Sequence, residues 1–271
     1  MKRHFILATT LLIFFSSCSV NPYAPTNKMY KKQARTLAKT ISKSPLPFIE
    51  GPGVKTAPYF VGTVNFNLRK PNYVIIHHTA QNACEQTLKT FTTVKTQVSA
   101  HYVICKDGTI YHMLNDYLRA WHGGNAKWGS LTDINSSSIG IELDNNGFEA
   151  FTDTQINSLL SLLAMLKKNY NIPASNFIGH SDIAPKRKVD PNPLFPWKKL
   201  ASKGFGLWYD DMTEVPDSTF NSKTALRLIG YDVQDSIAAI KAFKLHFIQT
   251  ELSPQLTDFD KSVLDNLSKK Y

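Results

Sequence analysis

The chain has 271 residues and a formal net charge of +10; 42% of its residues are hydrophobic and 19% are charged. This composition excludes a wholly disordered chain, and the length allows one sizeable core with room for a small second domain. The positive charge favours a polyanionic partner, such as a nucleic acid, an anionic membrane surface or a cell-wall polymer. No zinc-finger spacing, glycine-rich phosphate loop or block of cations interleaved with aromatics occurs, so we expect no nucleic-acid partner.

Residues 1–17 have the pattern of a secretory signal peptide. Lys2 and Arg3 precede the apolar run 5–15, which is too short to span a bilayer as a stable helix. The run ends in Phe-Ser-Ser before Cys18, which resembles the bacterial lipoprotein processing site, where the cysteine becomes the acylated first residue. We therefore predict lipidation of Cys18 and a stable membrane anchor. An ordinary cleaved signal peptide with an incidental cysteine is the alternative.

A polar stretch follows the predicted signal peptide. Residues 19 to about 45 are rich in lysine and lack apolar periodicity, and residues 44–58 add four prolines and two glycines. We interpret residues 18–54 as a tether that holds a globular part away from a membrane.

The middle of the chain alternates between strand and helix patterns. Short β-branched or apolar runs predict buried strands at 73–76, 100–105, 138–143 and 177–179, with a turn at 106–109 leading into a strand at 110–113. A helix is expected at 87–98, and another begins at Thr152, where Gln155 completes a capping box. This alternation predicts that residues 55–205 form an α/β domain, a mixed central β-sheet flanked by helices.

The C-terminal residues 206–271 have a different character. Helical patterns at 221–229, 236–247 and 257–267 predict a small three-helix bundle. This part contains no polar constellation, so its residues suggest no chemistry of their own.

Two cysteines lie within the predicted α/β domain. Cys84 and Cys105 could form a disulfide in an oxidising compartment, but the sequence leaves their pairing open. Neither has the CxxC spacing of a cysteine metal site.

Two histidines stand at the ends of predicted strands, where side chains from different strands can converge on one edge of a sheet. His77 closes the strand at 73–76, and His180 follows the strand at 177–179. Because successive strand side chains point to opposite faces, only one of His77 and His78 can face a given site. A lone histidine is most often structural, so metal ligation by either strand-end residue is a hypothesis.

Glu142 is the most suggestive single residue, because a carboxylate inside an apolar strand is costly unless it is paired, protonated or used. Burial would raise its pKa toward that of a general base working near neutral pH. A place on a solvated face of the strand is the alternative.

The stretch 179–191 combines two potential metal ligands with three cations. His180 and Asp190 are ten positions apart, with Lys186, Arg187 and Lys188 between them. An imidazole and a carboxylate suit a divalent metal, above all zinc. The cations make sense if one of them faces an oxyanion that develops beside the metal.

Five motifs occur in the order seen in one family of enzymes. They are Ile75-Ile76-His77-His78-Thr79-Ala80, Ser99-Ala100-His101-Tyr102-Val103-Ile104, Ala120-Trp121-His122-Gly123-Gly124, Ser138-Ile139-Gly140-Ile141-Glu142 and the stretch 179–191. This arrangement resembles the zinc N-acetylmuramoyl-L-alanine amidases of the amidase-2 family, which share the peptidoglycan-recognition fold. The lipoprotein-like start and C-terminal helices resemble its outer-membrane branch, and the last module is similar to three-helix peptidoglycan-binding domains.

The resemblance implies a role for each matching residue. It places the zinc ligands at His77, His180 and Asp190, the catalytic glutamate at Glu142 and the catalytic lysine at Lys188. The phage branch has a tyrosine where this chain has alanine at position 100, so tyrosine-assisted catalysis is not implied. Relatives that only bind peptidoglycan lack the third ligand, so an aspartate at position 190 argues against a purely binding protein.

The resemblance implies one Zn²⁺ per chain and hydrolysis of the amide between N-acetylmuramic acid and L-alanine in peptidoglycan. His101, Trp121 and His122 are candidate walls of the substrate cleft, with packing as the alternative. We expect a monomer, anchored to the outer membrane through Cys18 and facing the periplasm. A non-catalytic peptidoglycan-binding protein on the same fold, and a basic membrane-surface or nucleic-acid binder, are the rival hypotheses.

Overall fold

The computed structural model describes residues 21–42, 63, 65, 68, 70–211 and 214–271. The chain divides into two compact units, Met1–Val64 and Asn65–Tyr271, which are considered separately. The predicted signal peptide and Cys18 lie outside the described residues.

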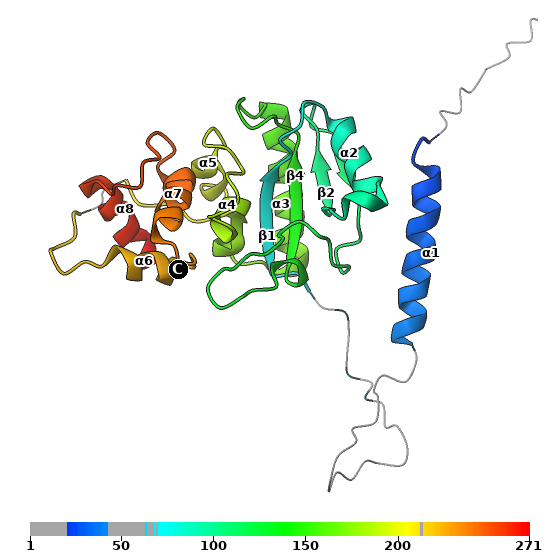
Figure 1. Cartoon of the computed structure of the whole chain (residues 1–271), viewed down its shortest axis with the longest axis horizontal. Helices are drawn as coiled ribbons and strands as arrows, with labels where there is room; N and C mark the ends of the chain where they lie inside the picture. The colour runs from blue at the N-terminus through cyan, green and yellow to red at the C-terminus, as the bar shows by residue number, and fades with distance from the viewer. Residues whose placement is uncertain (1–20, 43–62, 64, 66–67, 69, 212–213) are drawn as a thin grey trace, which may run out of the picture. The chain divides into compact units, whose positions relative to one another are not determined.

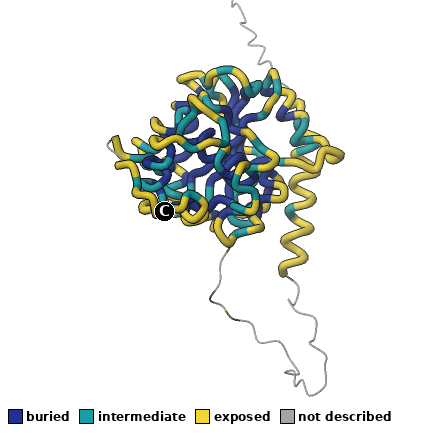
Figure 2. The backbone as a smooth tube through the Cα atoms, turned by 60° about the vertical axis from the view of Figure 1, so that its left-hand side comes forward, coloured by how far each residue is buried: buried dark blue, intermediate teal, exposed yellow. Residues whose placement is uncertain are grey.

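The described part of the first unit is a single helix, α1 (Ala24–Ile41), inside the stretch expected to be a tether. No residue of α1 is buried, as the exposed colouring of Figure 2 shows. Pro25 stands in its first turn, where a missing N–H costs nothing. Good helix formers, mainly lysine and alanine with single arginine, glutamine, leucine and methionine residues, make up most of the helix. High intrinsic propensity, rather than an apolar stripe, explains a helix that periodicity did not predict. None of the helices in the described ranges has both the length and the apolar character needed to cross a bilayer.

The second unit is built on a five-stranded sheet. Its strands are β1 (Tyr73–His78), β2 (Tyr102–Ile104), β3 (Ile110–His112), β4 (Ser138–Leu143) and β5 (Phe177–Gly179). Their spatial order is β3-β2-β4-β1-β5; only β3 runs antiparallel to its neighbour. This sheet and the helices on its faces confirm the predicted mixed α/β fold (Figure 1).

The alternation of strand side chains divides the core into two layers. Val74 and Ile76 of β1 pack in one apolar cluster with α3 (Asp153–Tyr170) and with Trp197 of α5 (Trp197–Ala201). Thr152 caps α3 as predicted, because its hydroxyl accepts a hydrogen bond from Gln155 N at 3.1 Å. The Gln155 side chain does not complete the expected capping box, because its Nε2 donates to Ile104 O at 2.9 Å and to Asp144 O at 3.1 Å. Ile75, which points the other way, belongs to the second cluster.

The second apolar cluster joins the sheet to the C-terminal helices. It brings Ile75 and Ile178 together with residues of α4 (His180–Ile183), α6 (Ser222–Ile229), α7 (Ser236–Phe247) and α8 (Asp258–Ser268). The three helices expected at the C-terminus are therefore present, and α6–α8 lie on the side of the sheet that α4 covers (Figure 1). They share one core with the sheet inside the unit Asn65–Tyr271.

A disulfide links Cys84, the first residue of α2 (Cys84–Thr92), to Cys105, just after β2, with 5.4 Å between their Cα atoms. The helix predicted at 87–98 begins three residues earlier and gives way to the short 3-10 turn η1 (Val94–Thr96). Two further 3-10 turns, η2 (Ile134–Ser136) and η3 (Ala174–Asn176), precede β4 and β5.

Candidate metal centre

Three side chains predicted as metal ligands meet at the carboxyl ends of β1 and β5. His77 comes from β1, His180 is the first residue of α4, and Asp190 lies on the loop that follows. One potential ligand atom from each lies within 4.8 Å of the others, and all three residues are buried. The Nδ1 atoms of His77 and His180 are 2.9 Å apart, and Asp190 Oδ2 lies 3.3 Å and 3.0 Å from them.

A chain of hydrogen bonds behind His77 determines which ring nitrogen holds its proton. The Ser138 hydroxyl donates to Ile134 O at 2.7 Å, so its oxygen is free to accept from His122 Nε2 at 3.1 Å. His122 Nδ1 then accepts from His77 Nε2, also at 3.1 Å. The Nδ1 lone pair of His77 therefore points into the cluster.

His180 is oriented in the same way. Its Nε2 lies 3.3 Å from the carbonyl of Gly123, which can only accept, so its Nδ1 also presents a lone pair. The Asp190 loop is held close because Ser181 N donates to Asp190 O at 2.8 Å.

Two lone pairs and a carboxylate facing one point repel one another unless a cation lies between them. Burial, followed by the charge on His180, lowers the pKa of His77 to about 4, which keeps its imidazole neutral as a metal ligand must be. Two imidazoles and one carboxylate thus fit a divalent metal ion.

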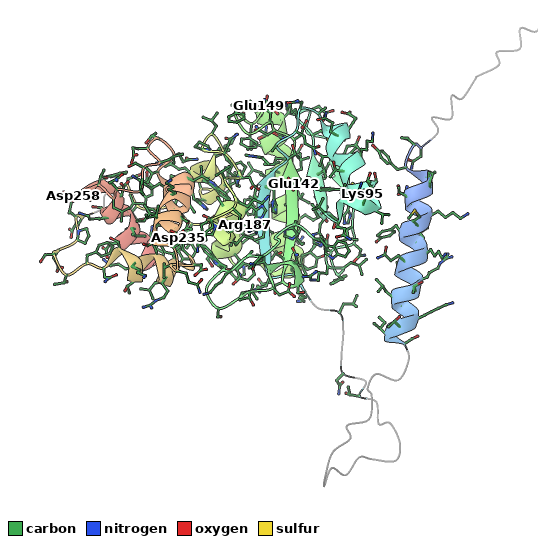
Figure 3. All side chains as sticks on the ribbon, in the orientation of Figure 1. Lys95, Glu142, Glu149, Arg187, Asp235 and Asp258 are labelled. Atoms are coloured by element: carbon green, nitrogen blue, oxygen red, sulfur yellow. A yellow bond between two sulfur atoms is a disulfide. The ribbon has the colours of Figure 1, made fainter. Side chains whose placement is uncertain are left out.

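Glu142 lies beside this cluster. It is in register with His77 across the parallel strands β1 and β4, so both side chains leave the sheet on the same face. Figure 3 labels Glu142 on β4. Glu142 Oε1 is 4.0 Å from His77 Nδ1, and 14% of its side-chain surface is exposed. Its Oε2 is buried without a hydrogen-bond partner in the described part of the chain.

The surroundings of Glu142 make it a candidate general base. Burial and the negative charge of Asp190 raise its pKa to about 8, while Lys188 opposes the shift. A carboxyl group so perturbed and lacking a partner is typical of a functional site.

Lys188 is partly buried on the loop between the two ligands His180 and Asp190. It forms no ion pair within the described residues, and its charge acts on both His77 and Glu142. The neighbouring Arg187 is tied to backbone carbonyls instead: its Nη2 donates to Gly123 O at 3.1 Å and to Asn125 O at 2.6 Å. The cations of this stretch therefore have different surroundings: Arg187 is hydrogen-bonded to the backbone, whereas the charge of Lys188 acts on the cluster.

The candidate cleft residues differ in their surroundings. His101 is fully buried: its Nδ1 accepts from Gly140 N at 3.1 Å, and its Nε2 lies 3.0 Å from Leu118 O. Both ring nitrogens of His122 are already hydrogen-bonded, one to His77 and the other to Ser138. For both histidines the geometry favours the packing alternative. Trp121 is 50% exposed and can still contact a ligand.

His78 lies on the opposite face from His77, as the alternation predicted. Its Nδ1 accepts from Asn192 N at 3.1 Å, so His78 fixes the loop just after Asp190.

Residues missed in the sequence include the supports of His122. Its backbone N–H and that of Gly123 both donate to Asn135 Oδ1, at 3.1 Å and 2.8 Å. A Cβ atom on Gly140 would come within 2.4 Å of the His122 ring, so the strand needs glycine there. The glycine inside an apolar strand was the available signal.

A cavity of about 670 Å³ lies beside Lys188. It extends to Lys241 and Leu245 of α7, so the C-terminal helices contribute to its wall. Most of the other lining residues are apolar or loop residues: Gly147, Phe148, Pro185, Val189, Asn192, Pro193, Leu194, Ala242 and Leu252.

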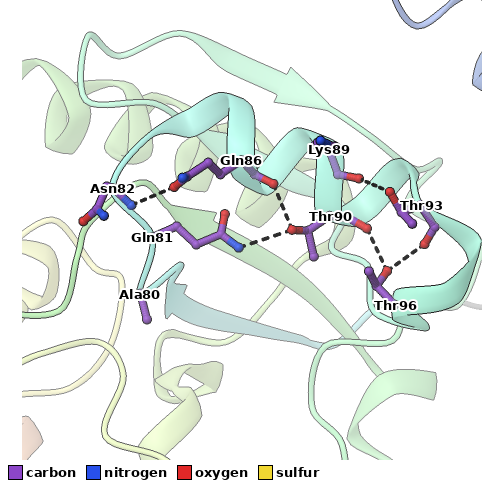
Figure 4. Close-up of a pocket in the computed structure, with 8 residues that line it drawn as sticks. All are labelled: Ala80, Gln81, Asn82, Gln86, Lys89, Thr90, Thr93 and Thr96. Atoms are coloured by element: carbon purple, nitrogen blue, oxygen red, sulfur yellow. Dashed lines mark hydrogen bonds between the residues drawn. The ribbon is translucent and has the colours of Figure 1, made fainter.

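A second cavity, of about 490 Å³, lies against α2 and offers less chemistry (Figure 4). Its polar side chains satisfy one another: Gln81 Nε2 donates to Thr90 Oγ1 at 3.2 Å, and the Thr96 hydroxyl lies 2.7 Å from the Thr90 carbonyl. Lys89 is its one titratable lining residue. We assign it no function.

Comparison with known proteins defines the class. The Amidase_2 family model, described as N-acetylmuramoyl-L-alanine amidase, matches residues 67–193. The N-acetylmuramoyl-L-alanine amidase AmiD of Escherichia coli strain K12 is 32% identical over 230 residues, which cover 73% of this chain and 82% of AmiD. The chain therefore belongs to the amidase-2 family.

Within that family, two solved structures cover most of this chain. The structure of E. coli AmiD with the substrate anhydro-N-acetylmuramic acid-L-Ala-D-γ-Glu-L-Lys has a TM-score of 0.67 at 29% identity, covering 82% of this chain and 97% of AmiD. AmpDh3 from Pseudomonas aeruginosa has a TM-score of 0.69 at 29% identity, covering 80% and 98%. The fold implied by the sequence motifs is confirmed.

Proposed function

We propose that this protein is a zinc-dependent N-acetylmuramoyl-L-alanine amidase that hydrolyses the amide between the lactyl group of N-acetylmuramic acid and L-alanine in peptidoglycan. The observation that carries the proposal is the position of Glu142, a buried carboxyl group with a raised pKa, 4.0 Å from His77 in a cluster of three converging ligands. Family membership supplies the reaction class.

His77, His180 and Asp190 would hold one zinc ion per chain. When bound, zinc supplies Lewis acidity and makes water nucleophilic near neutral pH. The ion's charge would also favour the ionised form of Glu142, which the buried site otherwise disfavours.

Glu142 and Lys188 would carry the proton and charge movements. Glu142 accepts a proton from the water that attacks the amide carbonyl, and the Lys188 ammonium faces the oxyanion that develops. Glu142 then returns the proton to the L-alanine nitrogen as the C–N bond breaks. The products are a muramic carboxylate and a peptide with a free amino group.

The cavity beside Lys188 is the proposed place for the stem peptide. Lys188 and Lys241 both line it, and neither forms an ion pair in the part of the chain that the structure describes. Unpaired cations on an apolar wall suit a peptide that carries carboxylates. The substrate bound by E. coli AmiD, which contains a γ-linked glutamate, is of this kind. Trp121 is the remaining candidate for contact with sugar or peptide.

Finer parts of the proposal concern location and domains. We propose a signal peptide at residues 1–17, a lipidated Cys18 and a tether at 18–54 that contains α1. The enzyme would be a monomer on the outer membrane, facing the periplasm. Residues 55–205 would form the catalytic domain and 206–271 a helical domain that binds peptidoglycan.

The test is a peptidoglycan digest. The protein lacking residues 1–18 should release peptides with new L-alanine amino termini, and a chelator should stop the release until zinc is restored. New reducing sugar ends instead would indicate a glycosidase. Zinc-independent binding without any product would favour the rival of a non-catalytic wall-binding protein.

A further inference from the structure

Asp182 is a fully buried carboxylate two residues after the proposed ligand His180. Three donors surround it, each at 2.7 Å. Gly179 N and His246 Nδ1 approach Oδ2, and the Tyr231 hydroxyl donates to Oδ1. Asp182, Tyr231 and His246 take no part in the proposed reaction.

The hydrogen bond from Gly179 N to Asp182 closes the turn in which His180 stands. Gly179 ends β5 and Asp182 lies in α4, so this bond brackets the ligand on both sides along the chain. A shift of Asp182 would therefore change the direction in which the His180 ring leaves the backbone.

The other two donors come from the C-terminal helices. Tyr231 follows α6 and packs edge-on against Trp128, with ring centroids 5.1 Å apart. His246 belongs to α7 and stacks on Trp197 at 3.8 Å. Because His246 Nε2 is buried without a partner in the described ranges, the ring proton belongs on Nδ1, where it meets Asp182.

We propose that Asp182, Tyr231 and His246 are positioning residues through which the C-terminal helices hold His180 in its metal-binding orientation. The helices α6 and α7 are then part of the catalytic unit, in addition to any role in binding the wall. The inference rests on the proposed function in taking His180 as a metal ligand.

A carboxylate with three short hydrogen bonds could also serve only to join the helices to the sheet. The two roles differ in what a lost donor changes. If Asp182 only joins the helices to the sheet, a lost donor should lower the stability of the protein and leave the metal site unchanged. If Asp182 positions His180, a lost donor should weaken metal binding, since outer partners of metal ligands typically contribute about 10–100-fold in affinity or activity.

The test compares variants of the full-length chain in detergent. Tyr231→Phe keeps the ring against Trp128 and removes one donor to Asp182. His246→Leu removes another donor, whereas His246→Asn offers an amide N–H in its place. Zinc affinity is measured by competition with a chromophoric chelator, and site geometry by the absorption spectrum of the Co²⁺-loaded protein.

We expect Tyr231→Phe and His246→Leu to weaken zinc binding about 10-fold and to change the cobalt spectrum. Their kcat should fall while KM stays close to the wild-type value, and His246→Asn should recover most of both losses. Thr257→Ala is the matched control: it removes the hydroxyl that accepts from Asp260 N in the α8 capping box, away from Asp182. This control should lower the unfolding temperature and leave zinc affinity unchanged.

Wild-type zinc affinity and an unchanged cobalt spectrum in both Tyr231→Phe and His246→Leu would overturn the inference. So would an equal loss of affinity in Thr257→Ala, since general destabilisation would then explain the effect. If one donor variant does not fold, the other decides. A wild-type protein that binds zinc but releases no amino termini would refute the amidase activity and leave this comparison intact.

Discussion

Two buried charged clusters in the same unit follow opposite rules. Lys244, fully buried in α7, is surrounded by acceptors: its Nζ contacts Glu251, lies 3.0 Å from Asp260 Oδ2 and donates to Gln255 O at 2.8 Å. Burial alone would lower the pKa of Lys244, but these hydrogen bonds raise it. Every ammonium proton has a partner, so the cluster is complete as it stands.

The cluster of His77, His180 and Asp190 lacks that balance. Its lone pairs face one another, and the neighbouring Glu142 has an oxygen without a partner within the described residues. This contrast distinguishes a structural charge cluster from a binding site. A structural cluster satisfies its own groups, whereas a site leaves them for a ligand.

Removing a ligand should have the largest effect. Asp190→Ala should abolish measurable turnover and prevent stoichiometric zinc binding, because only two histidines remain. Zinc content by mass spectrometry and release of amino termini check this. Full zinc occupancy in this variant would show that the cluster is not the metal site.

Glu142→Gln should separate binding from chemistry. Loss of the general base should lower kcat by about 10²–10⁴-fold. Zinc content should stay at the wild-type value, because Glu142 is not among the three converging ligands. Steady-state kinetics on a defined muropeptide measures the effect, and wild-type kcat would remove Glu142 from the mechanism.

Breaking the complete cluster should cost stability instead. Asp260→Leu leaves Lys244 buried with one carboxylate, and we expect a loss of about 3–5 kcal/mol in the free energy of unfolding. Adding Lys244→Met should restore much of this by replacing the ion pair with apolar side chains. Urea denaturation checks both, and a harmless single substitution would contradict the contrast between the clusters.

The proposed metal site should make the stability of the metal-free protein depend on pH. The raised pKa of Glu142 means that the folded, metal-free protein holds this proton more tightly than the unfolded chain. Stability should therefore fall as the pH rises from about 4.5 to about 8, and Glu142→Gln should remove that fall. Thermal unfolding of chelator-treated protein measures this; a variant less stable than wild type at pH 8 would contradict the sign.

Lys241 and Lys244 give the smallest comparison, on one helix. Lys241 is exposed and lines the cavity, whereas Lys244 is buried and forms ion pairs with carboxylates. Lys241→Glu should raise KM several-fold for substrates with a long acidic stem and leave kcat little changed. Lys223→Glu, the same charge change on α6 away from the cavity, is the control. An equal rise in KM for both variants would indicate a general charge effect.

Much of the site could be predicted because its residues occupy special places along the chain. His77, Glu142 and His180 stand at or near strand ends, and parallel strands bring such ends to one edge of a sheet. Amphipathic spacing and capping residues placed the start of α3 and both ends of α7 and α8 to within about a residue.

The supporting residues could not be predicted, because their roles depend on contacts between distant segments. Ser138 and His122 are ordinary strand and loop residues until the fold stacks them behind His77. Tyr231 and His246 lie in a part of the sequence without an evident polar pattern. Only the folded chain brings them within hydrogen-bond distance of Asp182. Helix α1 was missed for another reason: its propensity is intrinsic, and no buried face marks it.

The register of β1 and β4 has a consequence for changes in chain length. His77 and Glu142 are opposite each other through a backbone ladder that also pairs Tyr73 with Ser138. One inserted residue within either strand would turn one of these two side chains to the face that α3 covers. Substitutions in the core leave this pairing in place, but insertions and deletions in the strands do not. Length variation compatible with activity is therefore confined to the segments that connect the strands.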